Sequence, residues 1–309
     1  MGNKGLQGIN AIKGKEHLNN ALFCLHLKGE TDLQDVTDCI IFNPYNFGIM
    51  LNFERKGNGK ETLVLLHGFM ENLSIWSDME SHLSKDFALL KIDLPGHGQS
   101  EILAEVHTME LMAEEVKKVL DHENVEKVHL LGHSMGGYTS LAFAEQYPDS
   151  LKSLTLFFST YFPDDEEKKQ QRIKSYRIIK DSFSHYARVG IPNLFNPNER
   201  DILEGKIETA LETALSTNNL GALACVKGMV ERTDKKHILD NLEAKILVLA
   251  GKHDNAVKTD LMIRHLPERT NIKSYILDCG HNGHWEKPAI CAEIINTELL
   301  HNLPKKLVL

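Results

Sequence analysis

Short apolar runs alternate with helix-like patterns along most of this chain, and this alternation limits the possible folds more than any other feature. The runs are nearly continuous in Leu, Val and Ile, as strands buried on both faces of a parallel sheet must be. Between them lie amphipathic stretches such as residues 108–122, where Met112, Val116 and Val119 recur on one helical face. Strands that alternate with helices in this way predict an α/β fold with a mostly parallel sheet. The predicted strands are Thr62–Leu66, Ala88–Leu94, Val128–Leu131, Leu154–Phe158, Ile246–Ala250 and Ile272–Leu277.

The alternation stops between residues 161 and 236. This stretch begins with the acidic residues 164–167 followed by the basic residues 168–169, the charge order that the start of a helix prefers. It contains no convincing strand and is too long for an ordinary connection between two strands. We therefore expect a helical insertion that covers another part of the protein. The sequence therefore divides into three parts. They are an N-terminal extension of unknown role (1–38), an α/β core (39–160 and 237–309) and a helical cap (161–236).

Composition excludes several classes of protein. Apolar residues make up 42% of the 309 residues and charged residues 25%, a balance that excludes disordered and fibrous chains. The chain has 35 Lys and Arg against 43 Asp and Glu, a net charge of −8, and it has no basic block. We therefore expect neither nucleic acid nor an anionic membrane as a partner.

The apolar runs and the cysteines predict the cellular location of the protein. No run approaches 18 consecutive apolar residues, so the sequence predicts neither a membrane span nor a signal peptide. The cysteines are odd in number, widely scattered and without a C-x-x-C pair, which predicts reduced thiols in a cytoplasmic protein instead of disulfides or a zinc site. They are Cys24, Cys39, Cys225, Cys279 and Cys291.

The segment Gly132-His133-Ser134-Met135-Gly136 matches the pattern G-x-S-x-G. It lies between the strand-like run 128–131 and a helix of small residues, 136–144. A serine on such a sharp strand-to-helix turn is lifted above the sheet edge, and glycines allow the strand and helix to approach closely. The helix that follows directs its amides and positive dipole end at the reacting centre. We expect Ser134 to be a nucleophile and not a structural serine.

A serine nucleophile needs a base, and the base needs a carboxylate that orients it. In hydrolases of this type the chain order is serine, acid, histidine. Asp254 follows the strand 246–250 and His281 follows the strand 272–277, so both lie at carboxyl ends of strands, where open α/β sheets build their sites. The sequence predicts Asp254 as the acid and His281 as the base.

Two other residues compete for these roles. His284 lies three residues after His281, but His281 directly follows the glycine that ends the strand. Asp278 is an alternative acid, although its place at the strand end leaves it cramped against the histidine. We favour His281 over His284, and Asp254 over Asp278.

An acyl-transfer site also needs donors for the negative oxygen of its tetrahedral intermediate. One should be the backbone N–H of Met135, directly after the nucleophile, and the other should lie in the loop after strand 62–66. Phe69 is the predicted second donor, and His67 is expected to shape the loop instead of acting in catalysis. Such a donor typically contributes about 2.7–4 kcal/mol of transition-state stabilisation.

Together these residues resemble the α/β-hydrolase superfamily over residues 39–309. The resemblance implies the α/β-hydrolase fold, with a central sheet flanked by helices and a helical cap inserted after the sixth strand. It implies that His281 is catalytic, that Glu286 and Pro288 are structural, and that His97 belongs to a loop signature. The matching blocks are Leu66-His67-Gly68-Phe69 with Ser74 and Trp76, Asp93-Leu94-Pro95-Gly96-His97-Gly98 with Ser100, Gly132-His133-Ser134-Met135-Gly136-Gly137, Gly251-Lys252-His253-Asp254, and Gly280-His281-Asn282-Gly283-His284-Trp285-Glu286-Lys287-Pro288.

The resemblance also narrows the chemistry. Members that open epoxides or displace halide carry Asp where this chain has Ser134, and a lipase-like branch carries His-Gly-Gly-Gly where this chain has Phe69 and Met70 after Gly68. The match is closest to capped small-molecule hydrolases: esterases, carbon–carbon bond hydrolases, haloperoxidase-like proteins and lyase-like members. We expect a serine hydrolase of small carboxylic esters or related acyl compounds, working through an acyl-enzyme on Ser134 without a cofactor or metal. Tentative pocket residues are Met70, Trp76 and His133.

Three other functions remain open at this point. The same triad could hydrolyse carbon–carbon bonds or serve a lyase-like reaction. The chain could also have kept the fold of these hydrolases but bind a small ligand without catalysing a reaction. A metal enzyme built on His253, His281 and His284 is the third alternative, although no ligand spacing that includes a carboxylate stands out.

Overall fold

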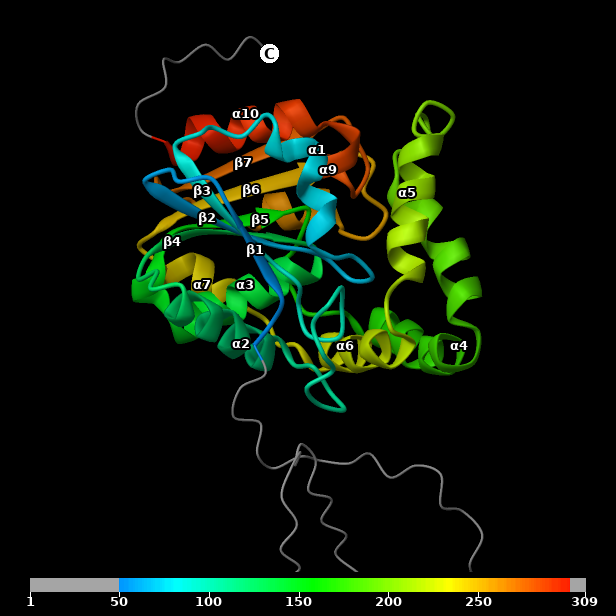
Figure 1. Cartoon of the computed structure of the whole chain (residues 1–309). Coiled ribbons are helices and arrows are strands. Elements are labelled where there is room, and N and C mark those ends of the chain that lie inside the picture. Colours follow the sequence, from blue (N-terminus) through cyan, green and yellow to red (C-terminus); the bar gives the residue numbers. More distant parts are fainter. Residues whose placement is uncertain (1–49, 301–309) are drawn as a thin grey trace, which may run out of the picture. The chain divides into compact units, whose positions relative to one another are not determined.

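A computed structural model describes residues 50–300, which form a sheet with helices on both faces (Figure 1). The strand order is β1-β3-β2-β4-β5-β6-β7, with β1 antiparallel to β3 and every other neighbouring pair parallel. The α/β-hydrolase fold expected from the sequence is confirmed. The strands are β1 (Phe53–Lys56), β2 (Glu61–Leu66), β3 (Phe87–Ile92), β4 (Val128–His133), β5 (Leu151–Phe157), β6 (Lys245–Gly251) and β7 (Ile272–Leu277).

Two strands differ from the expectation, and both lie at edges of the sheet. The pattern of buried apolar runs missed β1, because its sequence Phe-Glu-Arg-Lys is mostly polar and exposed. β7 was predicted correctly as a strand, but it is not buried on both faces: Lys273, Ser274 and Ile276 are exposed. An edge strand has a neighbour on one side only, so its side chains need not all be apolar.

Helices cover the two faces of the sheet in separate groups. In Figure 1, α2, α3 and α7 lie on one face, and α1, α9 and α10 lie on the other. Each face of the sheet has its own hydrophobic core, and β2 contributes residues to both. Val64 and Leu66 pack with the first group of helices, and Leu63 and Leu65 pack with the second. The helices are α1 (Ser77–Glu80), α2 (Met109–His122), α3 (Met135–Gln146), α4 (Glu166–Gly190), α5 (Glu204–Leu215), α6 (Asn219–Glu231), α7 (Lys236–Asn241), α8 (Thr259–Arg264), α9 (Gly283–Glu286) and α10 (Pro288–Leu299), with short 3-10 turns η1 (Leu73–Trp76), η2 (Pro148–Ser150) and η3 (Ile191–Leu194).

The helix predicted over residues 108–122 is present as α2. Thr108 caps its N-terminus, because the side-chain oxygen accepts a hydrogen bond from the Leu111 amide at 3.1 Å. The predicted apolar face is buried, with Met112, Val116 and Val119 fully inaccessible to solvent.

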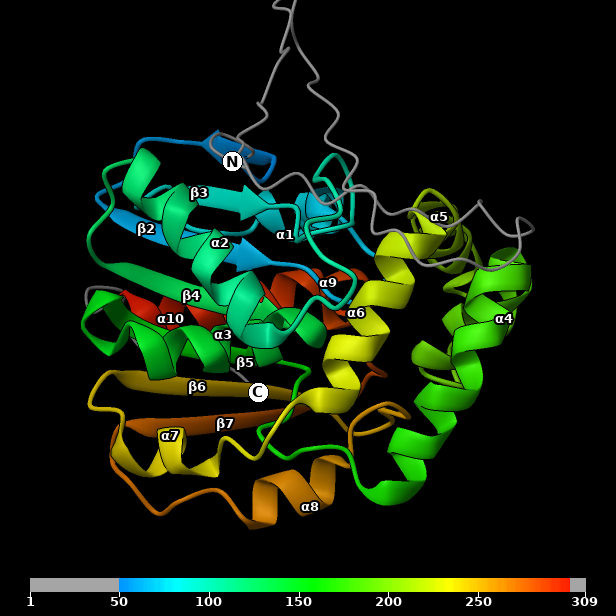
Figure 2. The same cartoon turned by 90° about the horizontal axis from the view of Figure 1, so that it is seen from below.

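Three helices, α4, α5 and α6, form the insertion between β5 and β6. The side chain of Asp165 caps α4, so this helix begins at the acidic run that the sequence indicated. Figure 2 shows the three helices beside the end of the sheet toward which the parallel strands run. The insertion follows the fifth strand of the described chain, not a sixth, since β5 is the last strand before it.

Several expectations fall outside residues 50–300, namely the N-terminal extension, Cys24 and Cys39. The other three cysteines, Cys225, Cys279 and Cys291, are free and buried. Within the described part of the chain, no helix combines the length and apolar character needed to cross a membrane.

Candidate active site

Ser134 occupies a strained turn between β4 and α3. Its backbone φ is 49° and ψ is −111°, a conformation that few residues other than glycine adopt. A Cβ on Gly132 would lie 2.2 Å from the Gly136 carbonyl oxygen, and one on Gly136 would lie 2.4 Å from the Leu66 carbonyl oxygen. Both glycines are therefore required for the close approach of strand, turn and helix.

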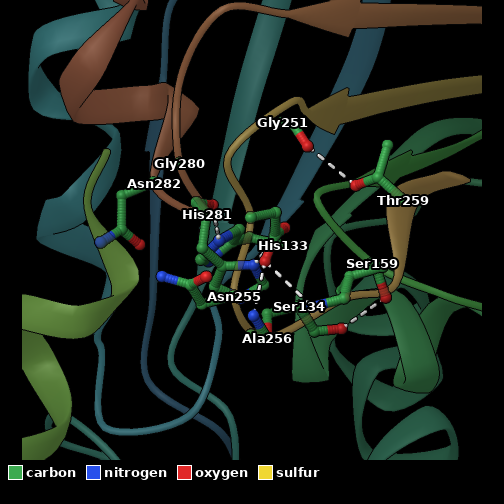
Figure 3. Close-up of polar contacts among 12 residues, drawn as sticks. His133, Ser134, Ser159, Gly251, Asn255, Ala256, Thr259, Gly280, His281 and Asn282 are labelled. Atoms are coloured by element: carbon green, nitrogen blue, oxygen red, sulfur yellow. Dashed lines mark hydrogen bonds and ion pairs between the residues drawn. The ribbon is translucent and has the colours of Figure 1, made fainter. Parts of the chain in front are cut away.

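Two hydrogen bonds hold this turn in place, one to β5 and one to a residue that follows β5. The Ser134 amide donates to the Phe157 carbonyl at 3.1 Å, and the Ser159 hydroxyl donates to the Ser134 carbonyl at 2.7 Å (Figure 3). Sequence reasoning did not find Ser159, because nothing in the local sequence links it to a residue 25 positions earlier.

Asp254 and His281 come together at the carboxyl ends of β6 and β7. Asp254 Oδ2 and His281 Nδ1 are 2.8 Å apart, and both side chains are almost completely buried. The other carboxylate oxygen of Asp254 accepts hydrogen bonds from the amides of Ala256 and Val257, at 2.8 and 2.9 Å. The carboxylate is therefore fixed toward Nδ1, while His281 Nε2 has no hydrogen-bond partner among residues 50–300 and can accept a proton.

Asp254 also sets the electrostatics of His281. Burial alone would lower the pKa of His281, but the charge of Asp254 and its hydrogen bond outweigh burial and raise this pKa. An imidazole with a raised pKa accepts a proton more readily, as a general base for a serine hydroxyl must.

His133, the residue before Ser134, contacts His281. His133 Nε2 lies 3.1 Å from the His281 carbonyl oxygen, and the two imidazole rings have centroids 5.0 Å apart. Figure 3 shows Ser134, His133 and His281 in one group, beside Asn255 and Ala256 of the loop after β6. Among residues 50–300 the Ser134 hydroxyl makes no hydrogen bond in this structure, and such contacts often tighten only when substrate binds.

The two competing residues have different surroundings. Asp278 is exposed, and its carboxylate lies 2.8 Å from His253 Nε2 instead of from His281. His284 is fully buried, and neither of its ring nitrogens has a hydrogen-bond partner among the described residues. Burial lowers the pKa of His284 well below its usual value, so this ring is a poor proton acceptor. The geometry favours Asp254 and His281.

In the loop after β2, the amides on either side of Phe69 are hydrogen-bonded. The Gly68 amide donates to Glu71 Oε2 at 2.5 Å, and the Met70 amide donates to His97 Nε2 at 3.1 Å. The Phe69 amide between them has no acceptor among residues 50–300, and neither has the Met135 amide at the start of α3. The two predicted oxyanion donors are therefore available to a ligand, whereas the amides of Gly68 and Met70 already have acceptors.

Glu71 belongs to this loop and was not found from the sequence. Its Oε2 accepts from the Gly68 amide and lies 2.8 Å from His133 Nδ1. Burial would raise the pKa of Glu71, but the charge and hydrogen bond of His133 outweigh it and lower the pKa to about 2. Glu71 is thus an ionised carboxylate that ties the loop after β2 to His133, the residue before Ser134.

Glu71, His133 and His284 are also the one described group with potential metal ligands close together, within 4.8 Å of one another. However, the 2.8 Å between Glu71 and His133 is a hydrogen-bond distance. Two ligands of one zinc ion, with bonds of about 2 Å in a tetrahedral arrangement, would lie about 3.3 Å apart. Both nitrogens of His133 already face oxygen acceptors, so the group fits an ion pair better than a metal site.

Other predicted residues have structural contacts. His67 Nε2 accepts from the Leu94 amide at 2.9 Å, which joins the ends of β2 and β3. Glu286 accepts from the amides of Asn196, Gly280 and Asn282, and so holds the loop that carries His281.

The tentative pocket residues Met70, Trp76 and His133 are all buried, with exposures of 5%, 0% and 1%. The Trp76 indole packs against Phe157 and His284 within the core. These side chains are part of the packed interior around the site, and their role as pocket residues stays a prediction.

Comparisons with known proteins agree with this geometry. A family model described as alpha/beta hydrolase fold matches residues 61–178. The solved structure of a thermophilic esterase from Thermogutta terrifontis, with malate bound, is 31% identical to this chain, with a TM-score of 0.74. The alignment covers 79% of this chain and 91% of the esterase. The chain belongs to the alpha/beta hydrolase family.

Two further comparisons describe the relatives of this hydrolase. A 2-hydroxy-6-oxononadienedioate/2-hydroxy-6-oxononatrienedioate hydrolase of Paraburkholderia phymatum is 28% identical over 268 residues, which cover 82% of this chain and 90% of that protein. The enol-lactonase of Burkholderia xenovorans is 21% identical with a TM-score of 0.74, covers 81% of this chain and 96% of its own, and supports the fold alone. The expectation of a hydrolase enzyme is confirmed.

Proposed function

We propose that this hydrolase cleaves small carboxylic esters or related acyl compounds through an acyl-enzyme on Ser134. The observation that carries the proposal is the 2.8 Å contact between Asp254 and His281, at the sheet edge where Ser134 occupies its strained turn. The free amides of Phe69 and Met135 support it, because acyl transfer needs donors for a developing oxyanion. The esterase of 31% identity supports the choice of ester as substrate.

In the proposed reaction, His281 Nε2 takes the proton of the Ser134 hydroxyl as its oxygen attacks the carbonyl carbon. Asp254 stabilises the imidazolium, and the amides of Phe69 and Met135 bind the oxyanion. His281 then gives the proton to the leaving alcohol. A water molecule, deprotonated by His281, then attacks the acyl-enzyme. As the bond between the acyl carbon and the Ser134 oxygen breaks, His281 returns the proton to this oxygen, and the carboxylic acid is released.

We also propose that residues 161–236 form a cap that determines substrate size. The His281 amide donates to the Leu194 carbonyl of η3 at 2.7 Å, so the inserted segment directly contacts the loop of the base. Replacing α5 by a Gly/Ser linker should flatten the preference for acyl-chain length while acetate esters are still cleaved. An unchanged chain-length profile would show that α5 has no part in specificity.

Fluorophosphonate labelling tests the nucleophile. Such probes modify activated serines, so the parent protein should be labelled at Ser134 and Ser134→Ala should not be labelled. Labelling of the variant at another serine, or no labelling of a folded parent, would contradict the proposal. Turnover of 4-nitrophenyl esters in the same samples distinguishes an enzyme from a protein that only binds ligand.

A second candidate function is hydrolysis of a carbon–carbon bond with the same three residues. It is favoured by the curated relatives of 26–28% identity, which are named as hydrolases of 2-hydroxy-6-oxononadienedioate. A phenyl ester that releases a coloured alcohol, compared with a vinylogous diketone acid, distinguishes the two reactions. A higher kcat/KM for the diketone acid would favour this candidate over the esterase.

A further inference from the structure

A pocket of about 530 Å³ lies against the loop that carries Asp254. This volume falls within the range of sites for small molecules. Its wall includes Ala256 and Val257, whose amides hold the Asp254 carboxylate, and Tyr138, one turn after Ser134 on α3. Ser134 and His281 are not part of this wall, so the pocket suits a part of the substrate remote from the reacting bond.

Lys168, in the first turn of α4, lines this pocket and is half-buried. Among residues 50–300, its ammonium group makes no ion pair or hydrogen bond. Burial, together with the charges of Arg172 and Arg232, lowers the pKa of Lys168, and nearby carboxylates only partly oppose this effect. Keeping a cation in such a place without a partner is unfavourable, so its presence needs an explanation.

The carboxylate that is best placed to pair with Lys168 already has two partners. Asp164 lies 2.5 Å from Arg172 Nε and 2.7 Å from Arg232 Nη2. Arg232 also packs over the Tyr138 ring, 4.0 Å from its centroid, which fixes the guanidinium in place. The single carboxylate of Asp164 thus faces three cations, and two positive charges are left in excess around this part of the pocket. The cations are Lys168, Arg172 and Arg232.

The other carboxylates in the wall do not cancel this excess. Asp165 pairs with Lys258 at 2.8 Å, and Glu167 and Asp234 are exposed to solvent. Exposed carboxylates are strongly screened by water and interact weakly with a half-buried ammonium.

We propose that Lys168 binds a carboxylate group of the substrate, at the end remote from the bond that Ser134 attacks. The inference rests on the proposed function and names its substrate class: anionic acyl compounds such as half-esters of dicarboxylic acids. The site is close enough to the triad for this role, because the charge of Lys168 acts on His281 and opposes the effect of Asp254 on its pKa.

Two matched esters test the inference: the 4-nitrophenyl monoester of adipic acid, which is anionic, and the methyl ester of that compound, which is neutral. The parent should have a higher kcat/KM for the anionic ester. Lys168→Met should reduce the ratio of anionic to neutral kcat/KM by about tenfold to a hundredfold, the range for one hydrogen bond to a charged group. Lys168→Arg should restore most of the ratio.

Lys174→Met is the matched control, because Lys174 lies on the exposed side of the same helix and does not line the pocket. It should leave the ratio unchanged. Circular dichroism should show that Lys168→Met is folded, since the ammonium it removes has no partner among residues 50–300. An unchanged ratio in Lys168→Met, or an equal fall in Lys174→Met, would overturn the inference while the esterase function stands.

Hydrolysis of neither ester would count against the proposed function, and a binding measurement then decides the inference separately. Monomethyl adipate should bind the parent in isothermal titration calorimetry, and Lys168→Met should weaken its Kd at least tenfold. Absence of binding to the parent, or equal Kd values for the two proteins, would overturn the carboxylate site.

Discussion

In the proposed mechanism the Ser134 oxygen attacks only while His281 removes its proton, so loss of either side chain abolishes the same step. We expect Ser134→Ala and His281→Ala each to lower kcat by about 10⁶-fold, and the double variant to be no slower than either one. His284→Ala is the control, because that buried ring makes no hydrogen bond among residues 50–300, and it should cost about tenfold or less. Rates with 4-nitrophenyl acetate measure all four; a larger loss in His284→Ala than in His281→Ala would reverse the assignment.

The charge of Asp254 should be visible in the pH dependence of activity. The base must be neutral to act, so kcat/KM should fall as the pH is lowered through the His281 pKa, which Asp254 raises above the usual value. Asp254→Asn should move this midpoint to lower pH and reduce kcat by about 10⁴-fold, as the loss of this carboxylate does in other triads. Asp278→Asn, at the exposed alternative acid, should leave the pH profile of the parent in place.

The sequence predicted some site residues and missed others for a physical reason. Ser134 has a local signature, since the turn requires glycine two positions before and two positions after it. Asp254 and His281 each follow a recognisable strand. Glu71 has no such signature, because its partner His133 lies 62 residues away. Lys168 belongs to an ordinary charged helix start, and that it has no partner within the described part of the chain is visible only in three dimensions.

At the scale of elements, α6 is held against the core by backbone contacts that leave no room for side chains. A Cβ on Gly228 would lie 1.8 Å from the His107 carbonyl oxygen, just before α2. Gly228→Ala should therefore lower the free energy of unfolding by about 1–3 kcal/mol. Gly205→Ala is the matched control in α5, where an added Cβ meets nothing within 4 Å. It should be neutral or stabilising by up to about 1 kcal/mol in urea denaturation; equal losses in both variants would contradict this account.

Elements buried on all sides were predictable, and elements at edges were less so. Burial on both faces forces a strand such as β4 to be apolar throughout, which makes it easy to recognise. β1 pairs with one neighbouring strand and is mostly exposed, so its positions do not require apolar residues. The insertion could be recognised as helical, but the packing of α4 on α6 depends on contacts that no local pattern encodes.

For the whole molecule, several buried titratable groups make stability depend on pH in the same direction. Burial lowers the pKa of His97 to about 3 and that of His107 to about 4. These rings stay neutral in the folded chain but become protonated in the unfolded chain as the pH falls below about 6.5. The unfolded state then binds more protons, so acid destabilises the fold.

Glu71 adds a contribution in a lower pH window. Its folded pKa of about 2 lies below the model value of 4.5, so its stabilisation is complete above pH 4.5 and is lost as the pH falls from there toward 2. The full contribution is on the order of 3 kcal/mol, and about 1 kcal/mol of it should be lost by pH 4. Glu71→Gln removes the charge, so its deficit in unfolding free energy should be largest at pH 6–7 and smaller by about 1 kcal/mol at pH 4.

Urea denaturation of both proteins at pH 7, 6, 5 and 4 measures this difference, and the contribution of His107 cancels because Glu71 does not act on this ring. Glu101→Gln is the control, since Glu101 is exposed and its substitution should give no pH-dependent difference. A deficit in Glu71→Gln that stays constant from pH 7 to pH 4 would mean that Glu71 acts through its shape and hydrogen bonds instead of its charge. The ion pair between Glu71 and His133 would then not be what holds the loop after β2 against the turn at Ser134.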